Sequence, residues 1–141
     1  MPRSLSIAVA DPNPAMLEFY QQALAGLGHQ VICTASDGAQ LIECCDSQPI
    51  DMVMSEVQLP RANGTDAWAE VGERYHVPIV LVSNAYTAEA VARAQADHVM
   101  AYLIKPVKPV DLEAAIAVAL TRYGNIPAAS VPPPPLVRSH H

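Results

Sequence analysis

"DMVMSEVQLP", residues 51–60, indicates the fold of this 141-residue chain, because it reads as a short buried strand that runs into an acidic loop. Met52, Val53 and Met54 form the apolar centre of the strand, and Glu56 follows it. In an open α/β sheet, ligands bind at the carboxyl ends of the strands. The stretch therefore raises the question of what a glutamate does at position 56.

Apolar runs of strand length alternate with segments of helical period along the rest of the chain. The predicted strands span residues 5–10, 30–35, 51–55, 78–83 and 101–104. A helix is expected after each strand, and Asn13-Pro14, Asp37-Gly38 and Thr87 supply start signals. Near-continuous apolar strands are typical of a parallel sheet covered on both faces. Five such pairs predict a flavodoxin-like, doubly wound (βα)5 α/β fold with the parallel strand order 2-1-3-4-5.

The bulk composition excludes several classes of protein. The formal net charge of −6 argues against a surface that contacts nucleic acid, which is normally basic. No apolar run approaches the ~18 residues that span a bilayer. The start of the chain has too short an apolar stretch for a signal peptide. We therefore expect a cytoplasmic protein without direct contact to nucleic acid or membrane.

The composition changes near Gly124. Residues 125–141, NIPAASVPPPPLVRSHH, have no helical or strand period, and Pro132–Pro135 favours an extended polyproline II segment. We expect one domain over residues 4–124 and a Pro-rich flexible tail or linker stub over residues 125–141. The alternative is a docking peptide for an aromatic groove.

Other notable side chains are expected to have structural roles. Cys33, Cys44 and Cys45 are odd in number and lack C-x-x-C spacing, so we predict buried free thiols rather than a metal or redox site. Arg93 and Asp97, four residues apart on a predicted helix, are expected to form a solvated ion pair of little energetic weight.

The loops after the first, third, fourth and fifth strands meet at the switch point of such a sheet. They bring together four polar side chains, those of Asp11, Glu56, Ser83 and Lys105. Mg²⁺ takes oxygen ligands, a hydroxyl bonds a phosphoryl oxygen, and a lysine offsets phosphoryl charge. The four side chains therefore predict a site that holds Mg²⁺ and a phosphoryl group.

With these residues in place, the chain resembles the receiver domain of a two-component response regulator over residues 4–123. The matching stretches are IAVADPNP (7–14), DMVMSEVQLPRANG (51–64), PIVLVSNA (78–85) and AYLIKPV (101–107). Within the second stretch, the P-x-x-N-G turn of residues 60–64 sits where the family carries its post-phosphosite turn. The segment MAYLIKPVKPVDLEAAIAVALTRY (100–123) is also similar to receivers of RNA-binding antitermination regulators.

The resemblance implies a role for each site residue. Glu56 occupies the phospho-acceptor position, and the implied metal-site residues are Asp11, Glu56 and Gln58. The implied phosphoryl-binding and switch residues are Ser83, Lys105 and Tyr102, and the Lys105-Pro106 peptide bond is expected to be cis. Whether Tyr102 points inward or outward is left open by the sequence.

Two departures from the family pattern bear on the chemistry. The family has an acidic pair after its first strand, but Asp11 is followed by Pro12, which removes a carboxylate and a backbone N–H. Glu56 stands where the family has aspartate, which moves the carboxylate outward by roughly one C–C bond, ~1.5 Å. A ~1 Å displacement of a reacting group can cost on the order of 10²-fold in rate. We therefore expect Mg²⁺ binding to be weakened and phosphorylation to be lost or reduced.

Three interpretations of Glu56 remain open. It mimics a phosphorylated aspartate, or it is a structural acid paired to Lys105, or it accepts phosphate slowly. Ser55 is a disfavoured alternative acceptor, because strand alternation points its side chain away from Glu56.

The leading hypothesis is an atypical receiver, or pseudo-receiver, that acts by binding a signalling partner such as a histidine kinase or an effector. A homodimer through the fourth helix, fifth strand and fifth helix is expected, near 88–96, Tyr102 and 109–120. The alternative is a conventional phospho-accepting receiver that regulates a transcription or antitermination domain in a longer parent. A small α/β enzyme is disfavoured, because no Gly-rich phosphate loop and no catalytic His or Cys lies near the strand ends.

Overall fold

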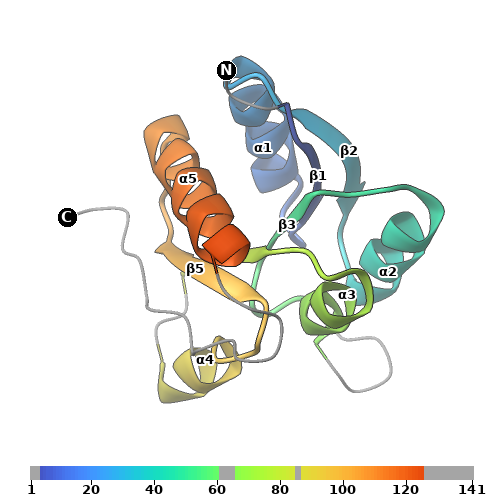
Figure 1. The fold of residues 1–141 in the computed structure, drawn as a ribbon, viewed down its shortest axis with the longest axis vertical. Coiled ribbons are helices and arrows are strands. Elements are labelled where there is room, and N and C mark those ends of the chain that lie inside the picture. Colours follow the sequence, from blue (N-terminus) through green and yellow to red (C-terminus); the bar gives the residue numbers. More distant parts are fainter. Residues whose placement is uncertain (1–3, 61–65, 85–86, 126–141) are drawn as a thin grey trace.

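A computed structural model describes residues 4–60, 66–84 and 87–125, which form alternating strands and helices (Figure 1). In chain order the elements are β1 (Ser6–Ala10), α1 (Pro14–Gly26), β2 (Gln30–Ala35), α2 (Gly38–Ser47), β3 (Met52–Ser55), α3 (Ala67–Tyr75), β4 (Ile79–Ser83), α4 (Ala88–Arg93), β5 (Val99–Ile104) and α5 (Pro109–Asn125). The strands pair in parallel in the order β2-β1-β3-β4-β5. This confirms the predicted flavodoxin-like topology.

Local sequence signals account for where the helices begin. The side chain of Asn13 accepts a hydrogen bond from the Ala15 N–H at 2.9 Å, and Pro14 opens α1. Thr87 caps α4 in the same way, by accepting from the Ala90 N–H at 3.1 Å. At the other end of α1, Gly28 adopts a φ of 90°, which only glycine takes readily, and the chain turns into β2 there.

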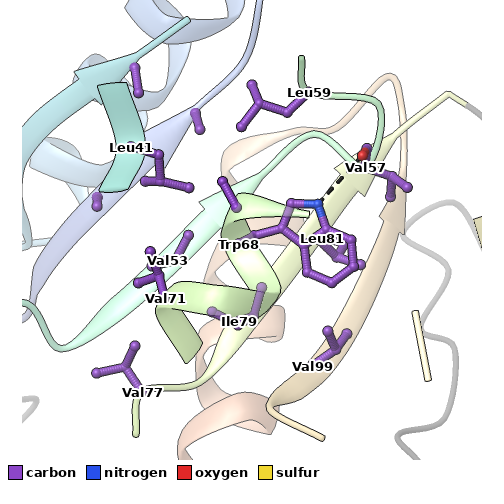
Figure 2. Packing of buried hydrophobic residues seen from close by; sticks show 14 of the residues in the cluster. Leu41, Val53, Val57, Leu59, Trp68, Val71, Val77, Ile79, Leu81 and Val99 are labelled. Carbon is purple, nitrogen blue, oxygen red and sulfur yellow. Dashed lines mark hydrogen bonds between the residues drawn. The ribbon is translucent and has the colours of Figure 1, made fainter. Parts of the chain in front are cut away.

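The sheet is buried on both faces, as its continuous apolar strands predict. On one face, buried residues of α1 and α5 such as Leu24 and Leu112 pack against the strands. On the other face, residues of α2, α3 and α4 pack around Trp68 (Figure 2). The indole Nε1 of Trp68 donates a hydrogen bond to the Val57 carbonyl at 3.4 Å. Trp68 thereby packs α3 against the loop that follows Glu56.

Two expectations about the chain lie outside the described residues. Most of the P-x-x-N-G turn falls in residues 61–65, and the Pro-rich tail falls in residues 126–141. Within the described part, α3 begins at Ala67. None of the helices in the described ranges is long and apolar enough to cross a membrane.

The expectation of three free thiols is wrong for two of the cysteines. Cys33 in β2 and Cys44 in α2 form a disulfide, and their Cα atoms are 6.4 Å apart. That separation lies within the range that a disulfide bridges. Cys45 is free and buried, as expected. The pairing depends on how α2 lies along β2, and the spacing of the cysteines in the sequence does not reveal it.

Candidate functional site

The carboxyl ends of the central strands bring together the side chains that the sequence singled out. Asp11 follows β1, Glu56 follows β3, and Lys105 follows β5. Ser83 is the last residue of β4. All four lie at one edge of the sheet because parallel strands end on the same side.

Lys105 forms the centre of this site. Its Nζ donates to Asp11 Oδ2 at 2.8 Å and to Glu56 Oε1 at 3.0 Å. The side chains are only 17% exposed for Lys105, 2% for Asp11 and 8% for Glu56, so water screens the contacts little. Burial opposes the charge of Lys105, but the hydrogen bonds and charges of the two carboxylates outweigh it and raise the lysine pKa. The site is therefore a largely buried cluster of two carboxylates and one ammonium group.

The second oxygen of each carboxylate is also occupied. Asp11 Oδ1 accepts the Asn13 N–H at 2.9 Å, and Glu56 Oε2 accepts the Gln58 N–H at 3.2 Å. Pro12 lies between Asp11 and Asn13 and has no N–H to donate. Each carboxylate is thus held by the same ammonium group and by one backbone amide.

The donor set agrees with Mg²⁺ in the type of ligand. Asp11 and Glu56 provide carboxylate oxygens, which this cation prefers. Within the described ranges, no group of three or more His, Cys, Asp or Glu side chains is arranged to hold a metal ion. Because Lys105 lies within 3.0 Å of both carboxylates, a cation at this position would compete with its ammonium group.

The residues expected to act as switch residues are in place around the site. Ser83 is fully buried, and its carbonyl accepts the Lys105 N–H at 2.9 Å. Tyr102 points inward with 1% exposure and belongs to the same buried cluster as Ala90 of α4. The Lys105-Pro106 peptide bond is cis, as expected. The structure therefore answers the question of the Tyr102 direction that the sequence left open.

Arg93 connects α4 to the loop that follows Glu56, which the sequence did not indicate. Its guanidinium forms an ion pair with Asp66, with Nε 3.0 Å from Oδ2, and donates to the Val57 carbonyl at 2.8 Å. The hydrogen bonds that Arg93 donates to Asp66 raise the pKa of the guanidinium. The expected pair with Asp97 is wrong, because the fold places α4 beside the start of α3 and offers a more buried partner.

Tyr20 lies on the inner face of α1 and is fully buried. Its hydroxyl has no hydrogen-bond partner among the residues that the structure describes. Burial raises the tyrosine pKa, and the charges of Asp11 and Glu56 add to the effect. Side chains of a helix lean toward its amino end, which for α1 is the end next to Asp11. The hydroxyl therefore leans toward the end of α1 that lies next to Asp11. The sequence did not indicate this buried polar group.

Comparison with known proteins agrees with the geometry. A family model described as "Response regulator receiver domain" matches residues 7–117. The chain is 34% identical over 101 residues to the transcriptional regulatory protein PdtaR of Mycobacterium tuberculosis, covering 72% of this chain and 49% of PdtaR. It is 31% identical over 138 residues to the sensory/regulatory protein RpfC of Xanthomonas campestris pv. campestris, covering 92% of this chain and 19% of RpfC. The chain thus spans about half or less of these relatives.

Solved structures show the same fold. The signal receiver domain of an HD domain-containing protein from Pseudomonas fluorescens Pf-5 superposes with a TM-score of 0.76 at 24% identity, covering 88% of this chain and all of that one. A CheY-like response regulator receiver domain protein from Methanospirillum hungatei JF-1 gives a TM-score of 0.75 at 19% identity, covering 86% of this chain and 98% of that one.

Proposed function

The chain belongs to the response regulator receiver family of two-component signalling, and we propose that it works by binding protein partners, with phosphorylation at Glu56 lost or reduced. Receiver domains are typically non-catalytic signalling modules that interact with histidine kinases and effector domains. They typically bind Mg²⁺ at their acidic site. The proposed module is residues 4–124, with 125–141 as a Pro-rich tail or linker. A cytoplasmic location stays a prediction.

The observation that carries this proposal is the position of the Lys105 ammonium group between Asp11 and Glu56, 2.8 and 3.0 Å from their oxygens. A carboxylate that attacks a phosphoryl group needs a free oxygen, and the product needs a cation to offset its charge. Here both oxygens of Glu56 already accept hydrogen bonds, and the ammonium group of Lys105 already offsets one of the two negative charges. In the structure, the ammonium group of Lys105 is therefore paired with carboxylates rather than available to a phosphoryl group.

The departure at Pro12 supports the same proposal for Mg²⁺. Bound Mg²⁺ would be held by Asp11, Glu56 and the Gln58 segment, and it would neutralise charge on a phosphoryl group. Pro12 adds no carboxylate, and Lys105 already offsets one negative charge. We therefore expect weaker Mg²⁺ binding than an additional acid at position 12 would permit.

Glu56 acts, in this proposal, as a permanent substitute for a phosphorylated aspartate. Its longer side chain reaches Lys105 without any modification. The structural interpretation, in which Glu56 only pairs with Lys105, predicts a different outcome. Glu56→Ala should weaken partner binding if the residue is a mimic, and Glu56→Asp without phosphate should resemble it. If the role is only structural, thermal stability falls and partner binding by the folded variants is unchanged.

The proposed interaction surface is formed by α4, β5 and α5, and we propose that a homodimer forms through it. Small side chains such as Ala88 and Ala92 are exposed on α4, which allows a partner to approach closely. Val110 on α5 is 61% exposed, which leaves apolar surface on this helix for a partner to cover. The homodimer is tested by measuring the mass of the protein in solution as a function of its concentration.

Phosphorylation is tested by incubating the protein with Mg²⁺ and acetyl phosphate and reading its intact mass. We expect no added phosphate. An added phosphate that disappears in Glu56→Gln would overturn the proposal.

The variant Pro12→Asp/Glu56→Asp should restore Mg²⁺ binding, measured by Mg²⁺-dependent fluorescence of Trp68. If the fluorescence of that variant does not change with Mg²⁺, then Pro12 and Glu56 do not explain the weak Mg²⁺ binding.

A conventional phospho-accepting receiver is the second candidate function. The observation that favours it is length: this chain covers 49% of PdtaR, whose name describes a transcriptional regulatory protein. This chain would likewise cover only part of a longer parent protein that carries a transcription or antitermination domain. The mass experiment separates the two candidates, because only the conventional receiver gains phosphate at Glu56.

A further inference from the structure

A groove lies at the amino ends of the strands, at the edge of the sheet opposite Asp11 and Glu56. It has a volume of about 430 Å³, and its lining includes Tyr75, Pro78, Leu120 and Tyr123. A neighbouring hollow of about 440 Å³ shares Tyr75 with it. Neither belongs to the site described above. The two hollows provide an extended surface with aromatic walls.

The lining of the groove is of the kind that binds proline-rich segments. Tyr75 and Tyr123 line the groove with partly exposed aromatic rings, and polyproline II segments dock in grooves lined by aromatic side chains. Leu120 is 37% exposed, and it and Val110 are the exposed large hydrophobic residues in the described part of the chain. A segment that covers Leu120 would remove apolar surface from water, which is favourable.

We propose that this groove binds the chain's own segment Pro132–Pro135. Leu120 and Tyr123 belong to α5, which ends at Asn125, so the tail leaves the domain beside the groove. The connecting residues 126–131 can span up to roughly 20 Å at ~3.3 Å each, enough to turn back onto it. Four residues of polyproline II extend over ~12 Å. This surface is independent of phosphorylation at Glu56, and it shares Leu120 of α5 with the proposed dimer face.

Charge and tethering both favour this occupant. Residues 126–141 contain no Asp or Glu and carry Arg138, whereas the chain as a whole has a net charge of −6. Asp51 lines the groove, and Asp46 lines the neighbouring hollow. A short flexible connection supplies an effective concentration on the order of mM, so a weak proline contact is populated without a second binding partner.

The test uses the full chain labelled with ¹⁵N. One variant replaces all of Pro132–Pro135 by glycine, and a matched control replaces residues 128–130 by glycine and keeps the prolines. We expect the amide signals of Ile50, His76 and Val77 to shift between the wild type and the first variant. The signal of Asp11, at the opposite edge, should stay in place, and in the control the signals of Ile50, His76 and Val77 should keep their wild-type positions.

Three results would overturn the proposal. Unchanged groove signals in the proline variant mean that the segment does not occupy the groove. Shifts that disappear when the wild type is diluted mean that the tail docks into a second copy instead. A second variant, Leu120→Glu, places a charge in the groove and should move the Leu136 amide signal toward its unstructured position. A Leu136 amide signal that stays at its wild-type position in Leu120→Glu also contradicts the proposal.

Discussion

Replacing Lys105 by methionine should destabilise the protein by about 3–5 kcal/mol, because it leaves two buried carboxylates without their shared cation. At an effective dielectric constant of about 20, each contact of 2.8–3.0 Å contributes about 6 kcal/mol of attraction. Desolvation of the lysine offsets much of that attraction in the wild type. Methionine keeps most of the apolar stem, so the loss measures the charge rather than the packing.

The assay is urea unfolding at neutral pH, followed by circular dichroism. Lys108→Met is the matched control, because Lys108 is the chain's other lysine and is exposed, and it should change stability by less than about 0.5 kcal/mol. Glu56→Gln combined with Lys105→Met should recover about 1 kcal/mol or more, because it removes one uncompensated charge. A Lys105→Met protein within about 1 kcal/mol of the wild type would refute the reasoning. So would a double variant less stable than Lys105→Met.

Four further changes test other parts of the structure. Gly72→Ala should cost about 1–3 kcal/mol in urea unfolding, because its Cβ would lie 2.9 Å from the Cβ of His98 and 3.1 Å from Cγ1 of Ile79. Tyr20→Phe should stabilise the protein by about 1 kcal/mol in the same assay, because it removes a buried hydroxyl that has no partner. Arg93→Ala should cost about 2 kcal/mol and increase deuterium exchange in α4, because it removes a charged hydrogen-bond donor from buried acceptors. Burial lowers the pKa of His98 below its usual 6.5, so its contribution to stability is present above that value and is lost as the pH falls through the folded-state pKa. Thermal unfolding of His98→Gln should therefore show a weaker loss of stability with acidification than the wild type.

Much of the fold could be predicted from the sequence because the deciding interactions are local. The apolar runs around Val53 and Val80 mark buried strands by themselves, and alternation with helical segments then leaves few topologies. Asn13 caps its helix through a contact two residues away, which explains why the start of α1 was predictable. The shared edge of Asp11, Glu56 and Lys105 followed from strand direction alone.

What the sequence by itself determined was therefore the set of elements, their order in the sheet and the residues at its functional edge. Only the tertiary structure decided which partners those residues take, because the partners lie far apart in the chain. Lys105 meets Asp11 across 94 residues, and Arg93 meets Asp66 across 27. Such pairs depend on how neighbouring loops and helices pack, to within an ångström or so, whereas apolar periodicity reports only which face is buried. The charge cluster at Glu56, the inward Tyr102 and the Cys33–Cys44 disulfide are consequences of that packing.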